Sequence, residues 1–234
     1  MHVTLKPAAL ALASALLLAA GVATPQPLPG FRPIPRPAQP TARTALEPAL
    51  AAVDQNEQIA ARQCAEDVQA AAKRFGDRTL RPLHDRRYRV QLETPALYSV
   101  SSYVRGNCFG AHPYESDESF TFDVTEGKAY DLRRLYRIVG GEKQHLLPPF
   151  RDTLRKALLK ARGARVSTEC ERVLNEDPLE NVEPISLALT AAGLRIAYFG
   201  PRVAQVCYRP VVLSYPSLRP YLDGGEASRL GWTR

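Results

Sequence analysis

One stretch, Cys108 to Tyr136, constrains the fold of this 234-residue chain more than any other part of it. Apolar residues alternate with polar ones in two runs, which is typical of half-buried β-strands. The runs are Phe120, Phe122 and Val124, followed by Tyr130 and Leu132. Gly127, between the runs, predicts a turn, and the CFGAHP segment before them predicts a tight loop. We therefore expect a loop, a strand, a turn and a second strand at the centre of the fold.

An export signal is predicted over residues 1–23. Lys6 precedes an apolar run over 8–20, and Ala19, Gly21 and Ala23 are the small residues that a signal peptidase requires. The run is short for a membrane span, although a retained N-terminal anchor is the alternative. No cysteine follows the small residues, which argues against a lipid anchor. We expect a periplasmic or secreted protein without a stable transmembrane segment.

Residues 24–48 are dense in proline and predict a semi-rigid linker. Proline lacks a backbone donor and fixes φ, so such a segment is expected to stay out of sheets and helix interiors. The Pro33–Pro37 run is also compatible with a ligand for an aromatic groove. A spacer ahead of a domain over 49–234 is the preferred interpretation.

A helix is predicted from Leu46 to Phe75, with Gly76 at its C-terminus. A basic patch follows it, formed by Lys73, Arg74, Arg78, Arg81, Arg86, Arg87 and Arg89. Such a patch is compatible with an anionic surface as partner, and the alternative is a row of solvated side chains beside a strand. Nucleic acid is not expected as a partner of an exported protein.

The remaining chain alternates between strand patterns and a few helical ones. Strands are predicted over 88–92, 97–104, 185–189, 194–198 and 206–213, an amphipathic helix over 148–163, an acidic loop over 169–183 and a short helical turn over 217–222. No strand–helix–strand repeat is present. These elements predict a single α+β domain with a mainly antiparallel sheet and two or three helices.

Four cysteines are spread along the chain: Cys64, Cys108, Cys170 and Cys207. In an oxidising compartment an even number predicts disulfides, and three pairings are open. We favour Cys64 with Cys108 and Cys170 with Cys207 because each bond would join elements that are adjacent in the sequence. The long separations do not fit a zinc pattern, so no metal site and no cofactor are expected.

The sequence contains no complete catalytic motif. The Gly-x-Ser-x-Gly elbow of serine hydrolases is absent, so no catalytic residue is assigned. His112, in the predicted loop, precedes Glu115, Asp117 and Glu118, and an imidazole beside carboxylates can act as a general base or bind a ligand. With Asp123, these residues are the ligand-binding candidates. The alternative is a histidine that only holds the loop in shape.

Several short motifs resemble the extracytoplasmic domain of the RsiV-like family. They are Tyr98-Ser99-Val100, Gly110-Ala111-His112-Pro113, Phe122-Asp123-Val124, Gly127-Lys128, Asp131-Leu132 and Leu135-Tyr136. The resemblance covers roughly Tyr88 to Leu222. This domain of unknown function occurs in the lysozyme-sensing anti-sigma factor RsiV and beside the catalytic domain of PdaC-type peptidoglycan deacetylases. The resemblance implies an α+β sheet domain that recognises lysozyme or cell-wall-related ligands.

The Thr121-Phe122-Asp123 run is similar to the Thr-Phe-Asp-Asp motif of polysaccharide deacetylases, but Val124 replaces the second aspartate. No His-x-x-x-His pair occurs either. The similarity is therefore to the accessory domain and not to the enzyme.

Together these features predict an exported, non-enzymatic binding domain of the cell envelope. Lysozyme, a peptidoglycan fragment or another envelope component would be its ligand. The net charge of +7 repels a cationic lysozyme at long range and suits an anionic envelope component better. The alternatives are an envelope hydrolase that uses His112 with a nearby carboxylate, and a structural protein of the envelope.

Overall fold

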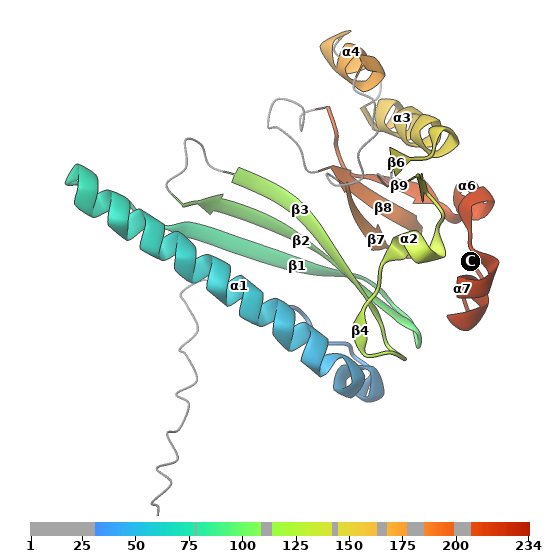
Figure 1. The fold of residues 1–234 in the computed structure, drawn as a ribbon, viewed down its shortest axis with the longest axis horizontal. Helices are drawn as coiled ribbons and strands as arrows, with labels where there is room; N and C mark the ends of the chain where they lie inside the picture. Colours follow the sequence, from blue (N-terminus) through green and yellow to red (C-terminus); the bar gives the residue numbers. More distant parts are fainter. Residues whose placement is uncertain are drawn as a thin grey trace, which may run out of the picture.

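The structure is a computed structural model that describes residues 31–77, 79–108, 114–141, 145–162, 168–176, 185–198 and 207–234 (Figure 1). The predicted signal peptide and the loop that contains His112 lie outside the described residues. The elements are α1 (Pro40–Phe75), β1 (Leu83–Glu93), β2 (Leu97–Asn107), β3 (Tyr114–Asp123), β4 (Lys128–Ala129), α2 (Leu132–Leu135), β5 (Val139–Gly140), β6 (His145–Leu146), α3 (Pro148–Arg162), α4 (Thr168–Glu176), β7 (Ile185–Leu189), β8 (Gly193–Tyr198), β9 (Val211–Ser214), α6 (Tyr215–Leu218), the 3-10 helix η2 (Arg219–Tyr221) and α7 (Gly224–Arg229).

The first sheet is antiparallel, with the strand order β1-β2-β3-β4. Its alternation places Tyr98, Val100 and Phe122 on one face, where they pack against Leu46 and Leu50 of α1. The long helix lies along this sheet (Figure 1). A second antiparallel sheet, β7-β8-β9, packs on the other side of the first, together with α3 and the C-terminal helices. The predicted α+β class with mainly antiparallel strands is confirmed.

The last residues of the predicted linker, 40–48, are helical in the structure. Helix α1 begins at Pro40 and not at Leu46. Proline is tolerated in the first turn of a helix, because the backbone N–H groups of that turn have no acceptor within the helix and the missing N–H costs nothing there. Pro48 lies inside the helix and removes one backbone hydrogen bond. The burial of Leu46 and Leu50 on the side of α1 that faces the sheet outweighs this loss. Before the helix, Ile34 is fully buried against the sheet.

Other local predictions are corrected in the same way. Tyr130 and Leu132 do not form a strand, because β4 ends at Ala129 and Asp131 caps the short helix α2 by accepting a hydrogen bond from the Arg133 amide. The predicted acidic loop over 169–183 contains helix α4. The strand predicted over 206–213 is shorter in the described residues and begins at Val211 as β9.

The structure pairs Cys64 with Cys108 and Cys170 with Cys207, which is the pairing favoured from the sequence. The first disulfide ties α1 to the end of β2, and the second ties α4 to the segment before β9. In the part of the chain that the structure describes, no helix has both the length and the apolar composition that crossing a bilayer requires.

Candidate functional site

An open groove of about 360 Å³ lies between α1 and the first sheet. One wall is formed by Ala49, Ala52, Val53 and Asn56 of α1. The other wall is formed by residues 119–122 of β3 and by Ala129 and Tyr130 at the end of β4. All of these α1 residues except Asn56 are apolar, so this wall can accept aliphatic or aromatic groups.

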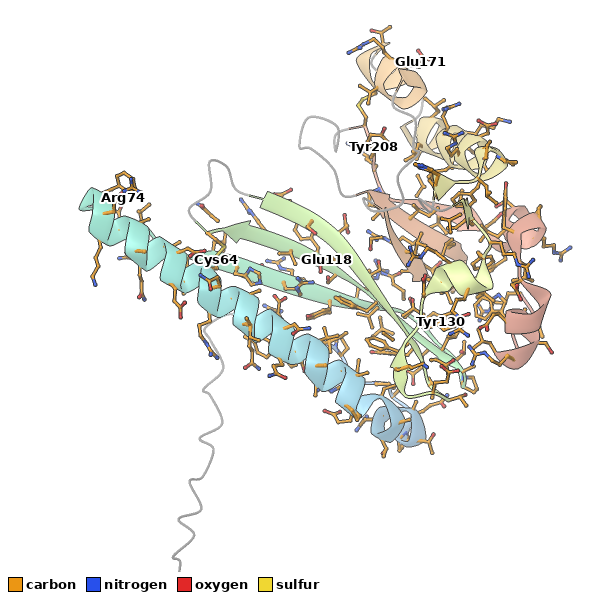
Figure 2. All side chains as sticks on the ribbon, in the orientation of Figure 1. Cys64, Arg74, Glu118, Tyr130, Glu171 and Tyr208 are labelled. Atoms are coloured by element: carbon orange, nitrogen blue, oxygen red, sulfur yellow. A yellow bond between two sulfur atoms is a disulfide. The ribbon has the colours of Figure 1, made fainter. Side chains whose placement is uncertain are left out.

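The groove exists because β4 is short. Only Phe122 and Asp123 of β3 pair with β4, and one further hydrogen bond of 2.7 Å joins the Tyr130 amide to the Thr121 carbonyl. Beyond Thr121, no strand among the described residues pairs with this side of β3. Tyr130, labelled in Figure 2, directly follows β4. The groove therefore runs beside the backbone of an open strand edge, which is a template for pairing with another chain.

The turn before β4 is shaped by Asp123 and Gly127. The Asp123 carboxylate accepts hydrogen bonds from the Thr125 and Glu126 amides at 2.9 and 3.0 Å. Gly127 has a φ of 65°, and a Cβ at this position would lie 2.8 Å from the Ala45 carbonyl oxygen of α1. The close approach of α1 to the turn thus requires glycine and holds the helix over the edge of β3.

The structure does not bring all of the candidate ligand-binding residues together. Asp123 and Glu115 lie at opposite ends of β3, about 26 Å apart for eight residues of extended chain. His112 lies outside the described residues, so its role as a base or as a structural residue stays a prediction.

Glu115, Asp117 and Glu118 belong to β3, and each faces an arginine of another strand. Asp117 accepts a hydrogen bond of 2.7 Å from Arg195 of β8, and Glu115 lies 3.8 Å from Arg105 of β2. Asp123 is completely buried and binds Arg229 of α7 at 2.6 Å. These contacts hold elements of the domain to one another.

A buried polar network that was not predicted from the sequence lies beneath the middle of α1. Glu57 of α1 contacts His84 Nε2 and Arg86 Nε, each at 2.6 Å. Arg86 also contacts Glu118 of β3 at 2.6 Å and donates a hydrogen bond to Ser102. Burial raises the pKa of Glu57, but the hydrogen bond from His84 and the charge of Arg86 outweigh it, so the pKa lies below its usual value.

The spacing of residues in α1 and in β1 indicates this network in the sequence. Glu57 continues the spacing of Leu46, Leu50 and Asp54, so it falls on the buried stripe of α1. Arg86 alternates with the exposed Arg87, so one member of the basic patch had to point inwards. A carboxylate on an apolar stripe facing a basic strand predicts a buried ion pair.

The lining of the groove is mostly apolar. Thr121 directs its hydroxyl to Ser99 at 3.1 Å, on the face of the sheet away from α1. Among the described residues that line the groove there is no histidine, cysteine or charged side chain. The lining offers apolar contacts, backbone hydrogen-bonding groups and the polar side chains of Asn56 and Tyr130.

No protein-family model matches the sequence, and no curated protein is significantly similar to it. Comparison of structures finds a member of the DUF3298 family from Bacteroides fragilis, 13% identical with a TM-score of 0.49, over 81% of this chain and 66% of that one. The chain thus spans slightly less than two thirds of that protein. A DUF3298 family protein from Pseudomonas aeruginosa is 14% identical with a TM-score of 0.44, over 79% and 81% of the two chains. The RsiV-like name stays a prediction from the sequence.

Proposed function

We propose that the chain is an exported, non-catalytic binding domain of the cell envelope, and that the groove between α1 and β3 is its binding site. The observation that carries this proposal is the apolar helix wall beside an open strand edge. The two disulfides support export, because disulfides persist in oxidising compartments.

The chemistry of the groove favours an extended polypeptide segment of an envelope protein as ligand. An added strand would take its hydrogen bonds from the β3 backbone, and every second side chain would enter the groove between Ala52, Val53 and Phe120. A glycan would place most of its hydroxyl groups against the alanine and valine side chains of the helix wall, where Asn56 is the one polar side chain of the α1 lining, and unpartnered hydroxyl groups cost free energy. The net charge of +7 disfavours a cationic lysozyme at long range.

The test is a pair of alanine-to-tryptophan substitutions on α1. Ala52→Trp fills the groove, whereas Ala51→Trp adds the same side chain at an exposed position that does not line it. The probes are fluorescent octapeptides with alternating apolar residues, soluble peptidoglycan fragments and a cationic lysozyme, with binding measured by fluorescence anisotropy. We expect the octapeptides to bind, and to bind at least tenfold more weakly to Ala52→Trp than to Ala51→Trp.

Two salt concentrations separate the ligand classes, since binding that depends on surface charge weakens as salt is added and apolar binding does not. Equal affinity of the two variants for the octapeptides would reject the groove as the site. Binding of peptidoglycan fragments or lysozyme alone would replace the polypeptide ligand with that class. If none of the three probes binds, the proposed function is wrong.

A further inference from the structure

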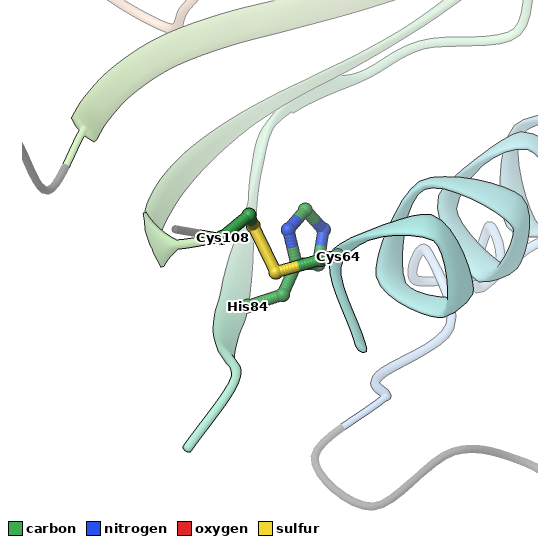
Figure 3. Close-up of side chains that lie close together, drawn as sticks. All are labelled: Cys64, His84 and Cys108. Carbon is green, nitrogen blue, oxygen red and sulfur yellow. A yellow bond between two sulfur atoms is a disulfide. The ribbon is translucent and has the colours of Figure 1, made fainter. Parts of the chain in front are cut away.

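The Cys64–Cys108 disulfide has a histidine beside it, contributed by a different element. Cys64 lies on α1, His84 on β1 and Cys108 directly after β2, and their sulfur and nitrogen ligand atoms all lie within 4.8 Å of one another. Figure 3 shows the His84 ring next to the two sulfur atoms, with one ring nitrogen turned towards them. Three soft or borderline ligand atoms therefore meet at one point between the helix and the sheet.

The orientation of His84 is fixed from its other side. Its Nε2 contacts the Glu57 carboxylate at 2.6 Å, which leaves Nδ1 on the side of the sulfur atoms. Glu57 is itself held by Arg86 at 2.6 Å, so the carboxylate cannot easily turn away. A carboxylate that orients a histidine in this way is the usual outer support of a zinc ligand, where it fixes the ring and raises its basicity.

We propose that the reduced chain binds one Zn²⁺ through the Sγ atoms of Cys64 and Cys108 and the Nδ1 atom of His84, with Glu57 as the supporting carboxylate. Ligand atoms of a tetrahedral zinc ion lie about 3.3–3.8 Å apart, given zinc–ligand distances of about 2.0–2.3 Å. The observed cluster needs only small movements to reach this spacing once the sulfur atoms separate. Three protein ligands leave the fourth position for water.

The site alternates with the disulfide. A dithiol reductant gives two electrons and two protons to the Cys64–Cys108 bond and becomes a disulfide itself, leaving two thiols. Zinc then binds as both thiols release their protons, since the thiolate is the form that ligates metal. A disulfide oxidant reverses the step: it takes the two electrons from the cysteine thiolates and two protons from water, becomes a dithiol, restores the Cys64–Cys108 bond and so releases the ion. His84 and Cys108 are partly exposed, so an ion has a route to the site.

The test compares the full-length chain in reduced and oxidised form. Each is incubated with Zn²⁺, passed through a desalting column and analysed for zinc by mass spectrometry. We expect one ion per reduced chain and none per oxidised chain. Co²⁺ in place of Zn²⁺ should give the thiolate charge-transfer band and the visible spectrum of a tetrahedral ion.

Matched variants separate this site from stray thiols. Cys64→Ser/Cys108→Ser should lose the ion although two thiols remain, whereas Cys170→Ser/Cys207→Ser should keep it. His84→Ala should weaken binding at least tenfold. Glu57→Gln should weaken it about 10- to 100-fold, as expected for an outer carboxylate, and Glu66→Gln, at an exposed position of the same helix, should leave it unchanged.

Two results would overturn the proposal. The first is a reduced chain that retains no more zinc than Cys64→Ser/Cys108→Ser. The second is a His84→Ala chain with unchanged affinity and an unchanged Co²⁺ spectrum, which would assign the ion to thiols of an unfolded chain. Far-UV circular dichroism of the zinc-loaded His84→Ala chain checks the second case, because zinc bound to an unfolded chain should leave the spectrum different from that of the native fold.

Discussion

The side chain of Asp123 is completely buried, and several donors balance its charge. Arg229 donates to it at 2.6 Å, and the amides of Thr125 and Glu126 donate from the turn before β4. Arg229 also contacts Glu226 at 2.9 Å. This cluster fastens α7 to the β3–β4 turn and so holds the end of the proposed binding edge.

Arg229→Met should destabilise the fold, because it leaves the Asp123 carboxylate buried without its cation. Breaking a buried ion pair costs about 3–5 kcal/mol. Arg229 is one-third exposed, and the backbone amides remain, so we expect about 2–3 kcal/mol. Urea denaturation measures the change. Arg137→Met is the matched control, since the exposed Arg137–Asp223 pair should contribute much less to the free energy of unfolding. If the two variants lost the same free energy of unfolding, this role of Asp123 would be contradicted.

Glu226 should make the stability of the domain sensitive to acid. The hydrogen bond from Arg229 lowers the pKa of Glu226 from its ordinary 4.5 to about 2, with further donors in Arg134 and Tyr130. A carboxyl with a lower pKa in the folded state stabilises the fold above pH 4.5, and this contribution is lost as the pH falls from 4.5 towards 2. Glu226→Gln lacks this dependence, so its melting temperature should fall less than that of the natural chain over this range. Calorimetry at pH 2–6 compares the two, and parallel curves would reject the assignment.

Helix α1 and the segment before it act as one element on the sheet. The Arg36 guanidinium joins Glu47 and Asp54 of the helix at 2.9 and 2.7 Å, and the Ile34 amide donates to Asp54 at 2.7 Å. Tyr98 of β2 donates its hydroxyl hydrogen to the Pro35 carbonyl at 2.7 Å. The proline-rich segment is therefore part of the domain from about residue 34 onwards, and it fixes the helix that forms one wall of the groove.

Ile34→Ala tests whether this segment belongs to the fold. Replacing a fully buried isoleucine by alanine costs about 2–5 kcal/mol, whereas an isoleucine in a free linker would contribute nothing. Ile59→Ala is the control, because Ile59 is 54% exposed on α1 and its loss should stay within about 0.5 kcal/mol. Denaturant midpoints of the two variants give the answer. An Ile34→Ala chain as stable as the natural chain would indicate that the segment is a linker and not part of the fold.

Across the whole molecule, a small polar contact joins the two sheets. Ser99 of β2 accepts a hydrogen bond of 3.0 Å from the Leu189 amide of β7 and shares another with Thr121. Arg195 and Asp117 add an ion pair between β8 and β3. The second sheet thus packs on the face opposite α1 and leaves the groove on the helix side open.

Ser99→Ala should destabilise the domain by about 1–3 kcal/mol, because the buried Leu189 amide loses its acceptor. Ser119→Ala is a close control on the neighbouring strand. Its hydroxyl is buried without a hydrogen-bond partner among the described residues, so its removal should be neutral or slightly stabilising. Thermal unfolding of both variants measures the difference. Similar losses of stability in Ser99→Ala and Ser119→Ala would show that packing, and not the hydrogen bond to the Leu189 amide, joins the two sheets.

Much of the fold was predictable because its signals are local. Alternation over β1, β2 and the second half of β3, the hairpin β7–β8 and the amphipathic helix α3 are all visible within short windows of sequence. Predictions failed where distant contacts override local preference. Pro48 argues against a helix interior, yet the burial of Leu46 and Leu50 stabilises one there. Tyr130 and Leu132 suggest a strand, yet the Asp131 cap turns the chain into α2.

The sequence by itself determined the α+β class and the residues with alternating burial, and it favoured the observed cysteine pairing through the adjacency of elements. Only the tertiary structure decided what the polar side chains do. Asp117 binds Arg195, 78 positions further along the chain, and Asp123 binds Arg229, 106 positions further along. Glu57 contacts His84, and Cys64 is bonded to Cys108, across the interface between the helix and the sheet. The groove likewise depends on where α1 crosses the edge of β3. Such contacts join residues far apart in the chain, and periodicity along the sequence carries no record of them.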